Sequence, residues 1–101
     1  MTPEEIKANI QNCLDEEGKI KRYPSKYKFK VIAQFYLTSK FEADIRYTEK
    51  EVNGILDNWH TFNDSSLLRR ELIAAHFLNR EKNGSAYWLE SIQPKFEDFK
   101  I

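Results

Sequence analysis

Two adjacent arginines, Arg69 and Arg70, lie in the segment SSLLRR and are the side chains best suited to bind an anion. A guanidinium group donates paired hydrogen bonds to phosphate or to the acceptor edge of guanine, and a serine hydroxyl can hold a phosphate oxygen. Successive helical residues point about 100° apart, so the two arginines cannot share one line of contacts. Alternatively, at least one of them braces the fold by pairing with Glu51, Asp57 or Glu71.

Two further segments carry basic side chains. The segment REKNGS at 80–85 offers Arg80 and Lys82, and the segment 18–30 has six basic residues and no acid. Each has a simpler interpretation, because a hairpin tip is usually polar and lysines often keep a helix face solvated. The residues predicted to contact nucleic acid are Ser65, Ser66, Arg69, Arg70, Arg80, Lys82, Lys26 and Lys28.

Catalytic and metal-binding arrangements are not evident. His60 and His76 have neither i, i+4 spacing nor a paired carboxylate, and the single cysteine, Cys13, has no partner. The three glycines are too dispersed to form a phosphate loop. We therefore expect no enzymatic activity and no cofactor, and we expect both histidines to lie at helix ends.

Length and composition indicate one small domain. With 101 residues, of which 14% are aromatic, the chain can build a core without a disulfide or a metal. The formal net charge is zero, which argues against a protein that coats nucleic acid indiscriminately. No signal peptide or membrane-length apolar run is visible, so we expect a cytoplasmic protein with no membrane contact.

The first half of the chain predicts two helices. Thr2, Pro3 and Glu5 are typical of a capped helix start, which predicts an N-terminal helix over residues 2–14. A second helix is expected from Ser25 to Lys40, although its bulky residues leave a strand as the alternative. Its expected inner face is Phe29, Ile32, Phe35, Tyr36 and Ser39.

The second half predicts a short strand at 45–47 and two more helices. Thr48 and Glu51 form a second capping box. The expected core positions of the helix that follows it are Val52, Ile55, Leu56 and Trp59. A further helix begins near Ser65, and its expected buried stripe is Leu68, Leu72 and Ala75.

Asn83-Gly84 between two apolar runs predicts a hairpin with a type I′ turn, with strands at 77–80 and 86–89. The tail, 91–101, is either a helix or an extended arm. A helical core over 25–76 followed by a hairpin over 77–90 predicts a mainly α fold with a small β wing (α+β). The expected architecture is a winged helix-turn-helix with an extra N-terminal helix.

Residues 18–90 resemble the domain of unknown function 2087. The resemblance rests on FEADIRYTEKEVNGIL, LRREL, FLNRE, Gly84 and the pair Tyr87-Trp88. It implies a winged-helix fold and a bacterial origin, in a family whose members occur alone or attached to transcriptional regulators.

These features favour a DNA-binding transcriptional regulator that uses the third core helix and the wing. A non-catalytic protein-interaction module with the same fold is the alternative, which the zero net charge favours. In either case the candidate surfaces for a homodimer are the N-terminal helix, with Ile6, Ile10 and Leu14, and the tail, with Phe96 and Phe99. The alternative is that the same residues close the core.

Overall fold

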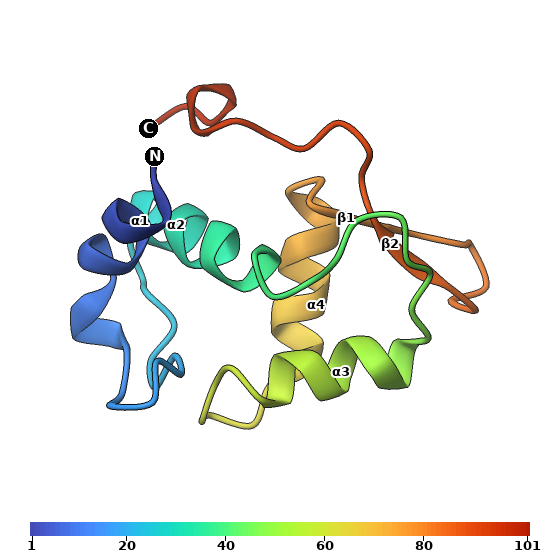
Figure 1. The fold of residues 1–101 in the computed structure, drawn as a ribbon, viewed down its shortest axis with the longest axis horizontal. Helices are drawn as coiled ribbons and strands as arrows, with labels where there is room; N and C mark the ends of the chain where they lie inside the picture. The colour runs from blue at the N-terminus through green and yellow to red at the C-terminus, as the bar shows by residue number, and fades with distance from the viewer.

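Four helices and a two-stranded antiparallel sheet make up the fold (Figure 1). The structure is a computed structural model that describes all 101 residues. The expected mainly α class with a small β wing is confirmed. In chain order the elements are α1 (Pro3–Asn9), a 3₁₀ turn (Gln11–Cys13), α2 (Tyr27–Thr38), α3 (Glu49–Asp57), α4 (Ser65–Ala74), β1 (Leu78–Arg80), β2 (Tyr87–Leu89) and a second 3₁₀ turn (Phe96–Asp98).

Both predicted capping boxes are present. At α1, the Thr2 hydroxyl accepts from the Glu5 N–H at 3.2 Å, and the Glu5 carboxylate accepts from the Thr2 N–H at 3.0 Å. At α3, Thr48 and Glu51 exchange the same pair of bonds at 3.1 and 2.8 Å. These bonds satisfy N–H groups that a helix start would otherwise leave free, so local sequence sets where both helices begin.

The N-terminal helix is shorter than the predicted range 2–14. It ends at Asn9, whose side-chain amide donates to the carbonyl of Glu5 at 2.8 Å. The chain then tightens into the first 3₁₀ turn, and Leu14 adopts extended backbone and bridges Ile20. The apolar spacing used for the prediction continues past Asn9. The backbone nevertheless changes there from α to 3₁₀ geometry, so the predicted helix was too long.

Helix α2 starts at Tyr27 rather than Ser25, and its buried surface is broader than the predicted stripe. Ser39, expected inside, is exposed, and Phe29 and Phe35 are only partly buried. The helix packs against α1 and against α4 (Figure 1), so it is covered on more than one side. Its buried residues are Val31, Ile32, Ala33, Gln34, Tyr36 and Leu37.

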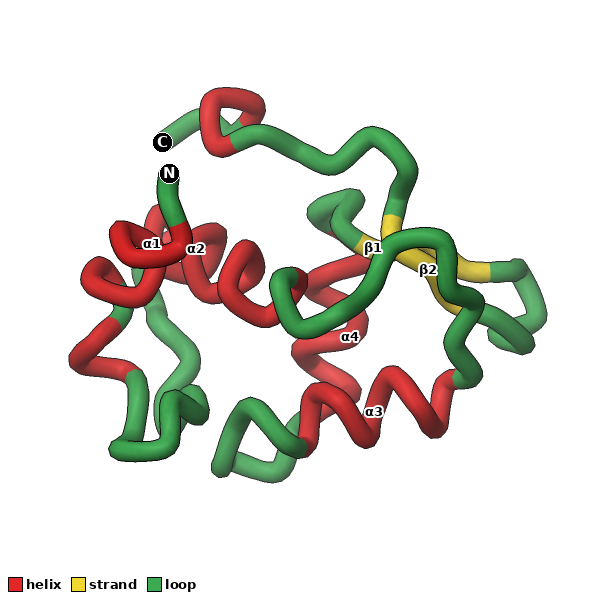
Figure 2. Tube along the Cα trace, in the orientation of Figure 1, coloured by secondary structure: helices red, strands yellow, loops and turns green.

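Helix α4 lies at the centre of the molecule, in contact with α2, α3 and β1 (Figure 2). The predicted stripe is confirmed at Leu68 and Leu72, which are fully buried, whereas Ala75 is half-buried. Each buried leucine contributes about 1.5–3 kcal/mol through removal of apolar surface from water. On α3, Val52 and Leu56 are fully buried and Ile55 is partly buried. Trp59, expected on this helix, lies just beyond its end and is also partly buried.

The hairpin forms, but its turn differs from the type I′ prediction. The strands pair Leu78 with Leu89 and Arg80 with Tyr87, one residue shorter on each side than expected. Only Gly84, at φ 74°, has positive φ, whereas a type I′ turn also requires it at Asn83. The Asn83 side chain instead accepts from the Ser85 N–H at 3.0 Å, a local bond that favours a longer loop.

The predicted strand at 45–47 is reduced to one residue. Tyr47 and Tyr87 exchange both backbone hydrogen bonds, each at 2.7 Å, so Tyr47 extends the wing by a single bridge. Asp44, at φ 62°, turns the chain out of extended geometry just before this segment. Arg46 then clamps the wing, with a 2.8 Å ion pair to Glu81 and its guanidinium 4.7 Å from the Trp88 ring centre.

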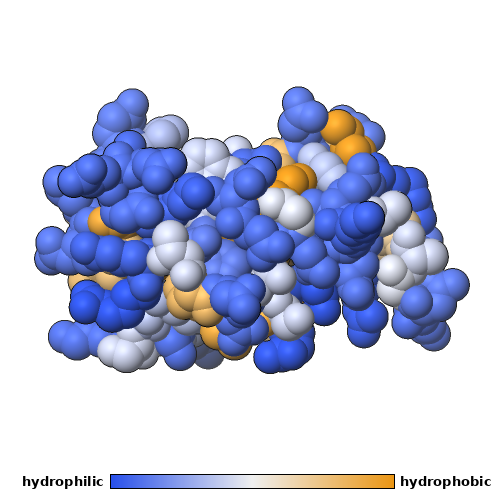
Figure 3. Space-filling model, turned by 90° about the horizontal axis from the view of Figure 1, so that it is seen from below, coloured by the Kyte–Doolittle hydropathy of each residue, from blue (hydrophilic) through white to orange (hydrophobic).

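The tail is an arm that closes the core together with the segment that follows α1. Phe99 packs against Phe35 and Phe77, with ring centroids 5.8 and 5.9 Å apart. Ile10 and Leu14 are buried in the same core, so these residues cap it. The face seen in Figure 3 is mostly hydrophilic, with small and separate apolar areas. None of the helices combines the length and hydropathy needed to cross a bilayer.

Candidate nucleic-acid interface

The start of α4 is held in place by a buried histidine. His60 Nδ1 lies 2.6 Å from the Leu56 carbonyl at the end of α3, and its Nε2 accepts from the Asp64 N–H at 2.9 Å. Asp64 in turn caps α4, because its carboxylate accepts from the Leu67 N–H at 3.1 Å. These contacts require a neutral ring with the proton on Nδ1, so His60 links the two helices, whereas the sequence predicted only a residue at a helix end.

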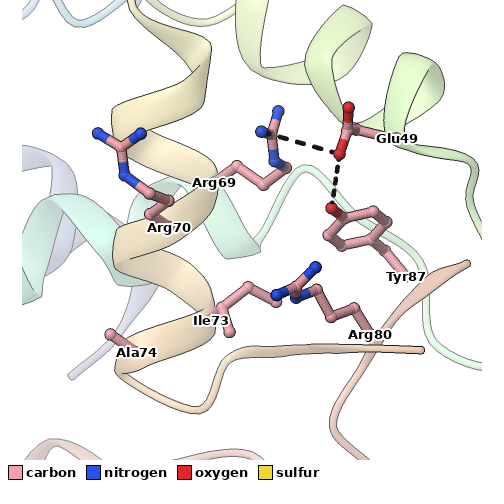
Figure 4. Close-up of a pocket in the computed structure, with 7 residues that line it drawn as sticks. All are labelled: Glu49, Arg69, Arg70, Ile73, Ala74, Arg80 and Tyr87. Carbon is pink, nitrogen blue, oxygen red and sulfur yellow. Dashed lines mark hydrogen bonds and ion pairs between the residues drawn. The ribbon is translucent and has the colours of Figure 1, made fainter. Parts of the chain in front are cut away.

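One ridge of α4 faces solvent. Ser66, Arg70 and Ala74 are exposed, and their i, i+4, i+8 spacing places them along a single face. Leu68 and Leu72 lie on the buried face. Arg70 therefore points away from the core, and its side chain makes no hydrogen bond or ion pair (Figure 4).

Arg69 has the opposite environment. Its guanidinium donates to the Asn53 side-chain oxygen and lies 3.8 Å from the Glu49 carboxylate, and only 16% of the side chain is exposed. Asn53 and Glu49 are four residues apart on α3, so both face α4. Arg69 thus joins the two helices as a brace.

The partners predicted for such a brace, Glu51, Asp57 and Glu71, are wrong. The Glu51 carboxylate is occupied in the α3 capping box. Glu71 accepts a hydrogen bond from the Tyr23 hydroxyl at 3.0 Å. Asp57, the last residue of α3, is exposed.

Glu49 also ties the wing to the helices. The buried Tyr87 hydroxyl donates to Glu49 Oε1 at 2.9 Å, the same oxygen that faces Arg69 (Figure 4). Burial raises the pKa of Tyr87, and its hydrogen bond to the Glu49 carboxylate adds to the rise. One carboxylate therefore connects α3, α4 and β2.

A cavity of about 330 Å³ lies between α4 and the wing. Arg80 extends into this region from β1 toward Ile73 (Figure 4), and its guanidinium, like that of Arg70, has no hydrogen-bond or ion-pair partner. Three arginines against one carboxylate leave the lining with a formal charge of +2. Such a surface attracts anions. The lining residues are Glu49, Arg69, Arg70, Ile73, Ala74, Arg80 and Tyr87.

The tip of the wing borders this cavity. A Cβ atom at Gly84 would lie 3.8 Å from Arg80 Nη1 and 4.0 Å from both Glu49 Oε1 and the Tyr87 hydroxyl. Gly84 also has φ 74°, a conformation that L residues rarely adopt. The glycine is thus required by the loop that closes over the Arg80 side of the cavity.

The basic segment 18–30 divides between two parts of the surface. Lys21 lines a hollow beside Asp15 and Glu16, next to α1. Lys30 lines a separate cavity of about 380 Å³ on the α2 side of α4. That cavity is lined by Tyr27, Lys30, Gln34, Glu71, Ala74, Ala75, His76 and Phe99. The segment is therefore not one patch.

Of the eight predicted contact residues, the structure brings Arg69, Arg70 and Arg80 together around one cavity. The other five line neither cavity beside α4. Ser65 is half-buried, and the exposed ones are Ser66, Lys82, Lys26 and Lys28.

The predicted contact residues left out four contributors, Glu49, Asn53, Tyr87 and Lys30, although Lys30 belongs to the basic segment 18–30. The i, i+4 spacing of the first two was the available signal that they share a face of α3.

Comparison with known proteins identifies the family. The family model described as an uncharacterized protein conserved in bacteria (DUF2087) matches residues 19–89. The chain belongs to this family. The match confirms the resemblance seen over residues 18–90, and it covers α2, α3, α4 and the wing while leaving out α1 and the tail. No curated protein and no solved structure gave a match.

Proposed function

We propose that this protein is a non-catalytic DNA-binding module of the winged-helix type, acting as a transcriptional regulator in the bacterial cytoplasm. Helix α4 would enter the major groove, and the wing would contact the backbone. The observation that carries the proposal is the pair of unpartnered arginines, Arg70 on the α4 ridge and Arg80 on the wing, around one cavity of net positive charge.

The contacts of the basic residues indicate a different role for each of them. Arg70 is free to reach base edges, where arginine binds guanine through two hydrogen bonds. Arg80 and the exposed Lys82 suit the phosphate backbone. Arg69 is already bonded to Asn53 and would position α4 from behind without touching DNA.

Salt dependence of binding to a fluorescent random duplex tests this proposal. Surfaces making about four phosphate contacts lose about 150-fold in affinity between 50 and 200 mM salt. We expect a fall of that order, and a marked loss of affinity in the Arg70→Gln/Arg80→Gln double variant. Lys21→Gln, which removes a lysine on the α1 side, is the matched control and should bind as the unaltered protein does.

A protein partner is the second candidate. Glu49 and Glu71 lie on either side of the α4 ridge, and the chain as a whole has zero net charge. These carboxylates weaken attraction to DNA and would suit a partner surface of mixed charge. Absence of duplex binding at 50 mM salt would overturn the DNA proposal and favour this one.

A further inference from the structure

The exposed ridge of α4 runs between two cavities. On the wing side, Arg69, Arg70 and Ile73 line the first cavity. Of these, Arg69 and Ile73 point toward the wing, and Arg70 lies at the outer edge of the helix (Figure 4). On the α2 side, Glu71 and Ala75 line the second cavity. Ala74 lines both, so the two cavities meet the ridge from opposite sides at this residue.

Each cavity offers a basic side chain that lacks an ionic partner. On the wing side this is Arg80, and on the α2 side it is Lys30, whose Nζ lies 5.9 Å from the centre of the Tyr23 ring. The carboxylate on each side is bonded to a tyrosine hydroxyl, Glu49 to Tyr87 and Glu71 to Tyr23. Neither Arg80 nor Lys30 is within ion-pair distance of the carboxylate on its side of α4.

The diameter of a helix is compatible with the major groove of B-form DNA. A helix with its side chains is about 10–12 Å across, and the major groove is about 12 Å wide. A helix in that groove consequently has one phosphate backbone on each side. The two cavities occupy these positions relative to α4.

Building on the function proposed above, we propose that the ligand is a B-form duplex held across α4 by both of its strands. Arg80 contacts the backbone of one strand, and Lys30, with the exposed Tyr27 beside it, contacts the backbone of the other. The ridge of Ser66, Arg70 and Ala74 then faces the base edges. The small Ala74 side chain permits close approach and suits contact with a thymine methyl group.

This arrangement excludes other nucleic acids. A single strand offers only one backbone and cannot occupy both sides of α4. An RNA duplex has a deep and narrow major groove that protein elements cannot enter. The inference therefore requires preference for double-stranded DNA over both.

The test is an anisotropy titration with duplex DNA, single-stranded DNA and duplex RNA of the same sequence at 50 mM salt. Lys30→Gln and Arg80→Gln should each weaken duplex DNA binding about tenfold and lower the salt-dependence slope by about one. Lys30→Arg should restore the affinity lost in Lys30→Gln. Lys21→Gln should have no effect, and circular dichroism establishes that each variant is folded.

Three outcomes would contradict the inference. A Lys30→Gln variant that binds as tightly as Lys21→Gln would remove the second-strand contact and leave α4–wing binding to DNA intact. Equal affinity for duplex and single strand would contradict both the two-strand arrangement and the entry of α4 into the major groove, while leaving DNA binding itself in place. No binding to any DNA would overturn the proposed function together with this inference. These titrations thus distinguish failure of the two-strand arrangement from failure of DNA binding itself.

Discussion

The two sides of α4 are built from the same pair of groups placed in different surroundings. On the wing side the Tyr87 hydroxyl donates to Glu49 at 2.9 Å, and on the α2 side the Tyr23 hydroxyl donates to Glu71 at 3.0 Å. Beyond that bond the two sides differ. Glu49 faces Arg69, whereas Tyr23 accepts a second hydrogen bond, at 2.9 Å, from the side-chain amide of Gln34.

Burial decides what each side contributes. Gln34 is only 6% exposed and its Oε1 has no partner, so its bond to Tyr23 is the only hydrogen bond of the side-chain amide. The Glu49 side chain is 51% exposed and can be solvated. The α2 side therefore acts mainly as an anchor for α4. On the wing side, the exposed Glu49 carboxylate contributes less to stability, and the positive charge there stays accessible.

The largest expected loss of stability is that of Tyr23→Phe, which is compared with Tyr87→Phe. Tyr23→Phe removes the partner of the buried Gln34 amide and should cost about 2 kcal/mol, whereas Tyr87→Phe leaves a solvated carboxylate and should cost about 1 kcal/mol. Urea unfolding of both variants checks this order. Equal losses, or a larger loss for Tyr87→Phe, would show that the wing side is as much an anchor as the α2 side.

The adjacent arginines give the next largest difference. Arg69→Ala removes the bond to Asn53 and should cost about 1–2 kcal/mol, which corresponds to a melting temperature lower by about 5–15 °C. Arg70→Ala removes no contact and should change stability by less than about 0.5 kcal/mol. Thermal melts of the two variants measure this directly. A comparable loss in Arg70→Ala would mean that this side chain is not free.

Alkaline pH should weaken the fold through the buried tyrosines. Burial raises the pKa of Tyr23, Tyr36 and Tyr87. An unfolded chain releases these protons near pH 10, whereas the folded protein retains them. The contribution of these tyrosines to stability is therefore constant below about pH 10 and is lost as pH rises above it.

Tyr23→Phe should flatten that decline more than Tyr87→Phe does, because the pKa of Tyr23 rises the most. Urea midpoints at pH 9, 10 and 11 measure the slope. An unchanged slope in Tyr23→Phe would contradict the assignment of the effect to its burial.

The smallest expected effect concerns the two carboxylates. Glu49→Gln and Glu71→Gln keep an acceptor for the tyrosine hydroxyl but remove a negative charge beside the proposed DNA surface. Each should raise duplex affinity about twofold, as expected for an exposed charge worth about 0.5 kcal/mol. Glu16→Gln, beside Lys21 on the α1 side, is the matched control and should have no effect. Weaker binding in either of the first two variants would contradict the placement of that side against phosphate.

Local signals predicted much of the fold. Thr48 with Glu51 placed the start of α3, and the apolar spacing of Leu68 and Leu72 placed the buried face of α4. The hairpin position followed from Asn83-Gly84. What failed depended on contacts distant in sequence. The buried surface of α2 is broad because α1 and α4 both pack on this helix. Tyr47 pairs with Tyr87, which is forty residues away in the sequence.

The site shows the same limit. Residue type identified Arg69, Arg70 and Arg80, but sequence could not distinguish the brace from the free side chain. That distinction depends on the rotation of α4 against α3, which places Arg69 beside Asn53 and turns Arg70 outward. Likewise, a basic run appears as one feature in the sequence, although the fold sends Lys21 and Lys30 to different surfaces.

The most direct test of the central claim is an NMR titration of the ¹⁵N-labelled protein with a short DNA duplex. We expect the side-chain Nε–H signals of Arg70 and Arg80 and the backbone signals of Ser66 and Ala74 to shift, while the Nε–H signal of Arg69 stays in place. Shifts confined to the α1 surface around Lys21, or no shift at all with saturating duplex, would contradict the account.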